Sequence, residues 1–384
     1  QLTGAVVILG SATPEITSSY KARQGEYRLL KLPQRLESSG KPIPLSNVRL
    51  VDMREELKSG NRDVFSRELK EELKRCVGAG NQAILFLNRR GSSSVVQCRT
   101  CGFVICCWRC ATSYTYHEPQ RLVCHYCNHR RKAPDKCPAC RSMNIRYLGI
   151  GTQRVTEEIQ ALLPDVSVLR WDSDTASSGR THTELLEQFS SGEAQILVGT
   201  QMIAKGLHVP SVTLVGAVLA DIGLHVSDFR AAERSFQVLC QVAGRAGRGS
   251  EPGKVIVQTY LPENYAIHFA ASQDYEIFYE KEMEYRRLHG NPPFGRLVRL
   301  VFNHRSEQAT QIEAQRIARQ LKRESNSWGF SKVDIIGPAP AYPPRLRNVW
   351  RWQILLRGTD PKPLLDKVTL PPNWVVDIDP IAAV

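Results

Sequence analysis

The chain has 384 residues, which is enough for two or three domains that each bury a core. A hydrophobic content of 42% and a charged content of 23% are those of globular proteins, and no run of eighteen apolar residues and no signal peptide is present. These features exclude a membrane protein and predict a cytoplasmic one. The net charge of +13 and a pI near 9.3 favour a polyanionic partner, and nucleic acid is the commonest.

Short apolar segments alternate with amphipathic ones over the first part of the chain. The chain begins inside an apparent strand at 5–9, so we expect a piece of a longer polypeptide. A Pro/Ser/Gly-rich stretch at 33–44 is typical of a linker. Strands are then expected at 48–52, 83–87, 166–169, 195–198, 212–219 and 255–259, and helices at 66–77, 155–163, 183–189 and 229–243. This alternation predicts a parallel α/β sheet.

The pattern changes after residue 261. A charged helix is expected at 265–288 and a second helix at 307–324. Strands are expected at 297–302, 333–336, 350–356 and 374–378. Two helices against three or four strands predict a small α+β domain.

Eight of the eleven cysteines form four Cys-x-x-Cys pairs that interrupt the α/β region. Two tetrahedral Zn²⁺ sites need this number of thiols, and the two-residue spacer lets a tight turn aim both sulfurs at one ion. Nothing in the chain indicates secretion, so metal binding is favoured over disulfides. Spacing alone leaves open whether the pairs combine in nested or sequential order. The predicted ligands are Cys98, Cys101, Cys107, Cys110, Cys124, Cys127, Cys137 and Cys140.

Other residues of the insert have two interpretations each. His125 and His129 flank the third cysteine pair and are alternative metal ligands. The aromatic side chains either stack on nucleic acid bases or fill the small core of a zinc module. They are Phe103, Trp108, Tyr114 and Tyr116. The remaining thiols, Cys76, Cys106 and Cys240, have apolar sequence neighbours and are expected in cores.

Two segments carry candidate phosphate-binding residues. In the segment 241–248, Arg245 and Arg248 lie three positions apart and each follows a glycine. This arrangement suits arginine fingers, whose guanidinium groups bind a phosphate. The alternative is that both arginines have only a structural role in a turn. The polar loop at 199–206 follows a buried strand, and α/β proteins place ligands at such strand ends.

Together with the segment 11–14, these two segments resemble motifs III, V and VI of superfamily 2 helicases. The segments 85–91, 228–234 and 241–248, with eight cysteines inserted between motifs IV and V, resemble the C-terminal half of the PriA (primosomal protein N′) family of bacterial replication-restart helicases. The segments 337–341, 350–356 and 377–380 are also similar to that family.

The resemblance implies an α/β fold: a RecA-like helicase second lobe with a two-zinc, eight-cysteine insert, plus a C-terminal α+β domain. The implied division is the end of helicase lobe 1 at 1–32, lobe 2 at 33–97 and 144–262, the zinc-binding insert at 98–143, and the C-terminal domain at 263–384. In the family's nested arrangement, the first and last cysteine pairs would hold one Zn²⁺ and the middle two pairs the other.

The resemblance also implies an ATP-dependent 3′-to-5′ DNA helicase that recognises stalled or D-loop forks and initiates primosome assembly. Arg245 and Arg248 would contact the γ-phosphate of ATP, with Mg²⁺ bound in the full-length protein. Gln241, Gly244, Thr200 and Gly206 would lie at the nucleotide.

The implied partners are forked and single-stranded DNA, the tail of single-strand DNA-binding protein and other primosome proteins, with no membrane, in a bacterial, nucleoid-associated setting. A basic aromatic cluster is the candidate for the acidic tail: Arg345, Arg347, Trp350, Arg351 and Trp352.

The sequence departs from the family at 206–210, where a Leu-His pair precedes Val and Pro, and at Ser173. It also contains no Gly-x-x-x-x-Gly-Lys-Ser/Thr loop and no Asp-Glu-x-His sequence, so the chain as given does not complete an ATPase site. We expect these elements upstream of Gln1. The main alternative function is a non-catalytic DNA-binding primosome adaptor. Arg245 and Arg248 argue against it, because an adaptor would have no reason to keep both. The second alternative is a zinc-ribbon nucleic-acid module.

Overall fold

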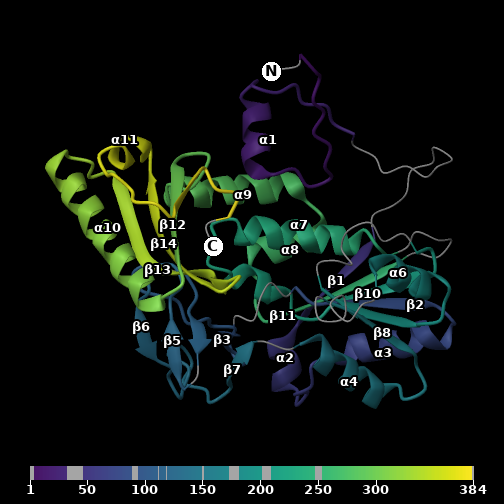
Figure 1. Cartoon of the computed structure of the whole chain (residues 1–384). Coiled ribbons are helices and arrows are strands. Elements are labelled where there is room, and N and C mark those ends of the chain that lie inside the picture. The colour runs from purple at the N-terminus through teal and green to yellow at the C-terminus, as the bar shows by residue number, and fades with distance from the viewer. Residues whose placement is uncertain are drawn as a thin grey trace.

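The computed structural model describes residues 4–32, 46–88, 94–110, 112–117, 119–148, 151–172, 181–200, 209–246 and 253–382. Three β-sheets organise these residues (Figure 1). No helix among them combines the length and the apolar character needed to cross a bilayer.

The largest sheet has six strands, all paired in parallel. Its four central strands are buried on both faces, which explains their near-continuous apolar content, whereas the edge strand β1 is more exposed. Their spatial order is β1 (Asn47–Asp52), β11 (Lys254–Thr259), β10 (Val212–Ala217), β2 (Gln82–Phe86), β9 (Ile196–Gly199) and β8 (Val168–Trp171).

Helices cover both faces of this sheet (Figure 1). Alternation along β2 divides the cores: Ile84 and Phe86 point to one, whereas Ala83 and Leu85 point to the other. One face carries α2 (Met53–Lys58), α3 (Arg67–Gly78) and α4 (Thr152–Leu162). The other carries α6 (His182–Ser190), α7 (Ala231–Ala243), α8 (Tyr265–Ser272) and α9 (Tyr275–Leu288). A short 3₁₀ helix, η1 (Ala220–His225), joins β10 to α7.

The cysteine-rich insert contains a five-stranded antiparallel sheet between β2 and α4. Its order is β6 (Arg130–Lys132), β5 (Arg121–Val123), β4 (Thr115–His117), β3 (Ser94–Cys98) and β7 (Ile145–Leu148). The small core around Val96, Tyr114 and Leu122 also includes Leu355 of the C-terminal unit, so the insert is packed against that unit.

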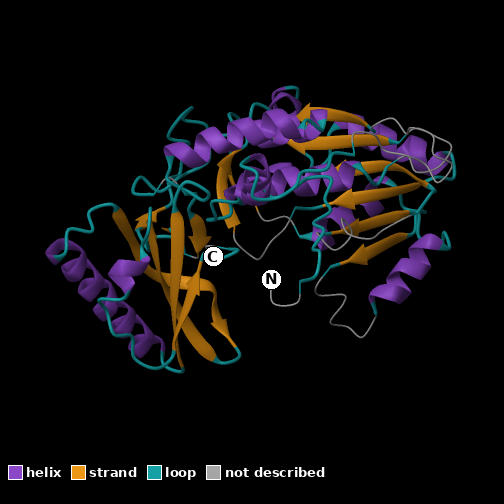
Figure 2. Cartoon of the chain, turned by 90° about the horizontal axis from the view of Figure 1, so that it is seen from above, coloured by secondary structure: helices purple, strands orange, loops and turns teal. Residues whose placement is uncertain are grey.

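The C-terminal unit is a four-stranded antiparallel sheet with the long helix α10 (Glu307–Ser327) on one face (Figure 2). Val298 and Leu300 of β12 pack with Ile317 and Leu321 of α10. The strand order is β13 (Val333–Leu346), β14 (Val349–Gly358), β12 (Arg296–His304) and β15 (Trp374–Ile378), and α11 (Lys362–Leu365) precedes β15.

The α/β class, the cysteine-rich insert and the C-terminal α+β unit expected from the sequence are confirmed. Each strand and helix expected from 48 to 259 overlaps an observed one within a few residues. The sequence analysis did not single out α2, η1 or α11, which are short.

The strand expected at 5–9 is wrong. Residues 4–10 adopt no regular structure, and Val6, Val7, Ile8 and Leu9 are 72–89% exposed. A strand exists only with a hydrogen-bonded neighbour, and no described strand lies beside this segment. The first described element is instead α1 (Ile16–Arg23).

The single helix expected at 265–288 is two helices. Gln273 has φ of 55°, which ends α8, and the side chain of Asp274 then accepts a hydrogen bond from the Ile277 amide and caps α9. Ala266, Ile267, Phe278 and Met283 lie in the core shared with α7. Both helices therefore belong with the six-stranded sheet, and the expected domain boundary at 263 does not match this packing.

Replacing the N-cap of α3 tests the local basis of this fold. Ser66 is fully buried and accepts a hydrogen bond of 3.1 Å from the Leu69 amide. We expect Ser66→Ala to lower the free energy of unfolding by about 1 kcal/mol, because the Leu69 amide loses its partner. Denaturant titration measures the change. The exposed Ser327→Ala at the end of α10 is the control, with an effect within about 0.5 kcal/mol. Equal effects of the two substitutions would contradict the capping role.

Candidate functional site

The polar loop expected at a strand's carboxyl end starts at Thr200, directly after β9. Thr200 is partly exposed and follows Gly199, which pairs with the last residues of β2 and β8. Gly206 lies outside the described residues. Thr200 is therefore at the edge of the sheet where α/β folds place ligands.

Gln241, Gly244 and Arg245 lie at the end of α7. Gly244 is the C-cap residue of this helix, and the Arg245 amide donates to the carbonyl of Val242. The carbonyl of the next residue, Ala246, accepts a 3.1 Å hydrogen bond from the Ser46 hydroxyl, just before β1. Arg248 lies outside the described residues.

These positions do not converge at one edge of the sheet. Helix α7 runs back across the face of the sheet, so Arg245 lies toward the amino ends of the parallel strands. Thr200 lies toward their carboxyl ends. The structure thus joins Gln241, Gly244 and Arg245 in one corner and leaves Thr200 apart from them.

Three of the four cysteine pairs have a common turn. In each, the residue after the second cysteine has a left-handed backbone, and its amide donates to the carbonyl of the first cysteine. These residues are Gly102, Asn128 and Arg141, with hydrogen bonds of 2.9, 2.7 and 2.9 Å. This turn points both sulfurs of a pair to the same side. Gly102 has a second constraint, since a Cβ there would collide with the carbonyl oxygen of Tyr260 in the strand-end segment after β11.

The eight thiols gather in two groups of four, in nested order. The ligand atoms of each group lie within 4.8 Å of one another. In the first group Cys98 and Cys140 are 3.6 Å apart and Cys101 and Cys137 are 3.7 Å apart. In the second group the Sγ distances are 3.6 Å for Cys107 and Cys127, 3.3 Å for Cys110 and Cys124, and 3.7 Å for Cys110 and Cys127.

Both groups fit a tetrahedral metal ion. Zinc bound to four thiolates at about 2.3 Å places the sulfurs about 3.8 Å apart, close to the separations observed. Burial raises the pKa of Cys101 and of Cys127 to about 12, so these two thiols hold their protons unless a cation replaces them, whereas a hydrogen bond with Cys110 lowers the pKa of Cys124 to about 5. The two four-cysteine groups can therefore hold metal ions, and of the two orders that the spacing left open the structure has the nested one.

The two histidines next to the cysteines have other partners. The His129 ring bonds the Tyr114 hydroxyl at 2.6 Å through Nδ1 and the Trp108 indole at 3.3 Å through Nε2. Nε2 of His125 lies 3.0 Å from Nε2 of His117. Neither histidine joins a group of sulfur ligands. Of the three other thiols, Cys76 is buried and Cys240 half-buried, but Cys106 is exposed, which the sequence did not predict.

The aromatic residues of the insert divide between the two roles considered for them. Tyr114 is fully buried and belongs to the core of the insert, and Tyr116 packs against that core. Trp108 is 73% exposed, with the guanidinium of Arg109 at 5.0 Å from its ring. Trp108 is thus the aromatic side chain best placed to stack on a base, with the partly exposed Phe103 second.

A basic hollow of about 400 Å³ lies on the outer strands of the insert. Strand β6 is the edge of its sheet, and all three of its residues, Arg130, Arg131 and Lys132, are exposed. The hollow is lined by these three residues with Pro119, Gln120 and Arg121. The sequence analysis noted the positive charge of the chain but not this convergence, which depends on Arg121 pairing opposite Lys132.

The basic aromatic cluster of the C-terminal unit is only partly accessible. Trp352 is buried, and Arg351 donates to the carbonyls of Tyr342 and Pro343. Arg345 lies over Trp350, with its guanidinium 5.5 Å from the ring.

Comparisons with known proteins agree with this architecture. A family model described as "Helicase conserved C-terminal domain" matches residues 141–250, and one described as "Primosomal protein N C-terminal domain" matches residues 287–381. The second match starts at the end of α9, near the place where the packing separates the C-terminal unit.

Curated relatives cover nearly the whole chain. The chain is 47% identical over 352 residues to the replication restart protein PriA of Bacillus subtilis, covering 91% of this chain and 43% of the relative. It is 41% identical to the PriA protein of Synechocystis, covering 100% of this chain and 47% of that relative. It is 38% identical to the PriA protein of Treponema pallidum, covering 97% of this chain and 56% of that relative. The chain thus spans about half the length of these relatives. It belongs to the PriA family of replication restart proteins and corresponds to their C-terminal half.

Proposed function

We propose that this chain forms the second motor lobe, with its insert and C-terminal unit, of an ATP-dependent DNA helicase for replication restart. The observation that carries the proposal is the position of Gly244 and Arg245 directly after α7, a buried helix on a six-stranded parallel sheet, in a member of this family. In the proposed division, the motor lobe runs from β1 to α9 and the C-terminal unit begins at β12.

In this function Arg245 and Arg248 contact the γ-phosphate of ATP across the interface with the first lobe. Guanidinium groups suit this role because they are always charged and bind phosphate oxygens bidentately. Gln241 and Gly244 lie at the same corner as Arg245, and we assign them to the nucleotide with it. Thr200 lies toward the opposite strand ends, so we do not assign Thr200 and the loop that leads to Gly206 to this contact.

The two four-cysteine groups hold one Zn²⁺ each in this proposal. Zinc bound by four thiolates has no open coordination position, so it supplies structure and no chemistry. The ions hold together the turns around Cys98, Cys107, Cys124 and Cys137, which the small core of the insert cannot order alone.

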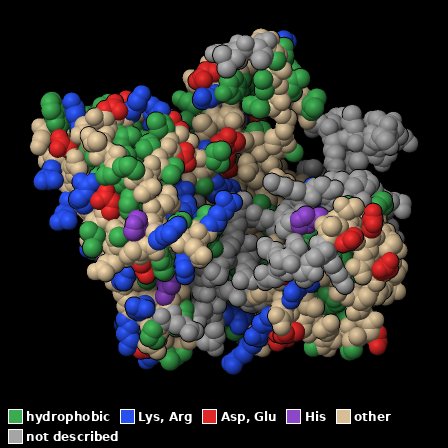
Figure 3. Space-filling model, viewed as in Figure 1, with side chains coloured by type: hydrophobic (Ala, Val, Ile, Leu, Met, Phe, Trp, Pro, Cys, Tyr) green, Lys and Arg blue, Asp and Glu red, His purple; other side chains and the backbone are tan. Residues whose placement is uncertain are grey.

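We place one DNA contact on the insert. Arg130 and Lys132 lie two residues apart on edge strand β6, so their side chains point to the same face. A row of exposed cations on a module that also carries an exposed tryptophan suits single-stranded DNA, since the cations bind phosphates and the ring stacks on a base. In Figure 3, Lys and Arg side chains are frequent on the side of the molecule that holds the insert and α10.

The finer parts of the proposal follow the family. They are 3′-to-5′ unwinding, recognition of stalled or D-loop forks, initiation of primosome assembly, and contact of Arg345, Arg347 and Trp350 with the acidic tail of single-strand DNA-binding protein. The competing function is a DNA-binding primosome adaptor without ATPase activity, and the first experiment below separates the two.

Removing the proposed arginine fingers tests the motor function. In the full-length gene product we expect Arg245→Ala and Arg248→Ala each to lower DNA-stimulated ATP hydrolysis by about 10³-fold, because the γ-phosphate loses a transition-state contact. Binding to forked DNA, measured by fluorescence anisotropy, should stay within about twofold.

The control is Arg49→Ala, which removes a largely exposed arginine from β1. Unchanged hydrolysis in both finger variants would refute their role. A wild-type protein that binds forks without hydrolysing ATP would establish the adaptor function instead.

Zinc content tests the metal sites and their nested order. Elemental analysis should return about two zinc ions per chain. In the double variant Cys98→Ser/Cys137→Ser both changes affect one nested site, so about one ion should remain. In Cys98→Ser/Cys107→Ser both sites lose a ligand, and zinc should be lost. Sequential sites would reverse the two results, and Cys106→Ser is the control that keeps both ions.

The salt dependence of DNA binding tests the contact on β6. In the full-length gene product we expect Arg130→Ala/Lys132→Ala to weaken binding to an oligo-dT strand and to flatten the plot of log K against log salt by about 0.7 per side chain. Lys136→Ala/Arg141→Asn removes the same charge from exposed positions near the last cysteine pair and should leave the slope unchanged, since asparagine tolerates the left-handed backbone at 141. The same loss of slope in both double variants would show that only the net charge of the insert matters.

A further inference from the structure

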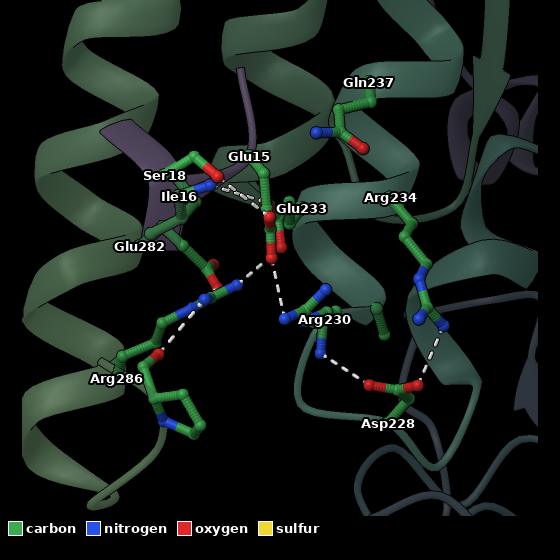
Figure 4. Close-up of polar contacts among 12 residues, drawn as sticks. Glu15, Ile16, Ser18, Asp228, Arg230, Glu233, Arg234, Gln237, Glu282 and Arg286 are labelled. Atoms are coloured by element: carbon green, nitrogen blue, oxygen red, sulfur yellow. Dashed lines mark hydrogen bonds and ion pairs between the residues drawn. The ribbon is translucent and has the colours of Figure 1, made fainter. Parts of the chain in front are cut away.

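The segment before α1 is attached to α7 by a stripe of polar side chains. Arg230, Glu233 and Gln237 are spaced three and four residues apart, so they lie on one side of the helix and of the turn that leads into it. Arg230 bonds the Glu15 carboxylate at 2.7 Å, Glu233 accepts from the Ile16 amide at 2.7 Å, and Gln237 donates to the Thr13 carbonyl at 3.2 Å. Figure 4 shows the three side chains along the helix.

Glu233 supplies the cap that α1 lacks. The N-cap residue of α1, Glu15, makes no capping hydrogen bond with its own side chain. Oε1 of Glu233 in α7, 217 residues away in sequence, accepts a hydrogen bond from the amide of Ile16, the first residue of α1. A carboxylate at this position also meets the positive end of the helix dipole. The start of α1 is thus fixed by α7 and not by its own sequence.

The same carboxylate is held from the other side. Oε2 of Glu233 accepts from Arg286 of α9 at 2.8 Å, and the guanidinium also donates to Glu282 at 2.7 Å and to the Pro292 carbonyl at 3.1 Å. Glu233, Glu282 and Arg286 are at most 2% exposed. Glu233 therefore bridges two donors, one on α1 and one on α9, in a place that water does not reach (Figure 4).

The stripe continues toward the proposed nucleotide corner. Gln241 lies one turn after Gln237, and Arg245 follows just past the end of α7. The other end of the link is the segment 11–14, which precedes Glu15 and in which Thr13 is buried. Helix α7 thus connects the segment 11–14 with the corner that contains Gln241 and Arg245.

We propose that Glu233 is a positioning residue that fixes the segment 11–16 to α7, so that this segment and Arg245 move as one body. The inference rests on the proposed motor function, because a fixed spacing between the two matters only if both serve one nucleotide site. Glu233 touches neither nucleotide nor DNA in this role and acts through α1 and α7.

The substitution Glu233→Gln tests the bridge with almost no change of shape. A carboxylate offers two acceptor oxygens, whereas an amide offers one, so glutamine cannot satisfy both Ile16 and Arg286. The matched control is Glu282→Gln. It removes a buried carboxylate from the same arginine but does not touch α1.

Hydrogen–deuterium exchange on this chain measures the attachment. In Glu233→Gln the amides of 16–19 should exchange about tenfold faster, because the lost cap frees the start of α1 to open. In Glu282→Gln they should exchange as in the wild type. Equal exchange in Glu233→Gln and the wild type would overturn the inference.

Steady-state kinetics on the full-length gene product measure the consequence. We expect Glu233→Gln to lower kcat for DNA-stimulated ATP hydrolysis by about tenfold or more, with KM for ATP within about twofold, because the reacting groups are misplaced but nucleotide contacts remain. Glu282→Gln should keep kcat within about twofold. Equal loss in the two variants would reduce Glu233 to a stabilising role and overturn the proposal.

The two measurements separate failure of the inference from failure of the proposed function. A wild-type protein without ATPase activity overturns the proposed function and the coupling to it, while the exchange rates still decide whether Glu233 holds α1. A wild-type protein with ATPase activity that Glu233→Gln leaves unchanged overturns the coupling alone.

Discussion

The buried guanidinium of Arg286 between Glu233 and Glu282 is the interaction on which the arrangement of α1, α7 and α9 depends. Leaving one member of such a group without its partner costs about 3–5 kcal/mol, because a charge stays buried without compensation. Two carboxylates face one guanidinium here, and the hydroxyl of Tyr265 and the amide end of α1 supply the remaining donors. Because hydrogen bonds between charged groups are directional and apolar contacts are not, this group favours one orientation of α1, α7 and α9.

The segment from η1 to the start of α7 connects the parts of the molecule. The carbonyl of His225 accepts from Ser113 of the insert, and Arg234 pairs with Asp228 and donates to the carbonyl of Ile381 near the end of the chain. Arg230 reaches Glu15. The insert, the C-terminal unit and the segment before α1 thus all attach to the residues that lead into a single helix. A displacement of this segment would therefore alter its contacts with the insert, the C-terminal unit and the segment before α1.

The insert is fixed to both of its neighbours. Arg99 donates to the Tyr260 hydroxyl at 2.8 Å, and Gly102 lies against the backbone of the same residue. On the other side, Leu355 of β14 enters the core around Tyr114. Metal ions in the two four-cysteine groups would compensate for a core too small to hold such a module by apolar burial. The exposed edge strand β6 makes none of these attachments in the described residues.

The sequence by itself determined the elements of the six-stranded sheet and the cysteines that form the two four-thiol groups. Period-two and period-3.6 patterns, the cap at Ser66 and the Cys-x-x-Cys spacing are local signals, and each was sufficient for its element. Local signals also misled: the apolar run at 5–9 has strand composition but no described strand to pair with, and a continuous helical pattern hid the break at Gln273.

Only the tertiary structure decided which distant groups meet. Nested grouping of the thiols, the convergence of Arg121 with β6, and the placing of α8 and α9 on the motor lobe depend on contacts that no local pattern specifies. Glu233 is the clearest case, since in the sequence it is one of many charged residues on an amphipathic helix. Its role arises because burial removes water and leaves it the Ile16 amide and Arg286 as partners, and no sequence pattern encodes that meeting.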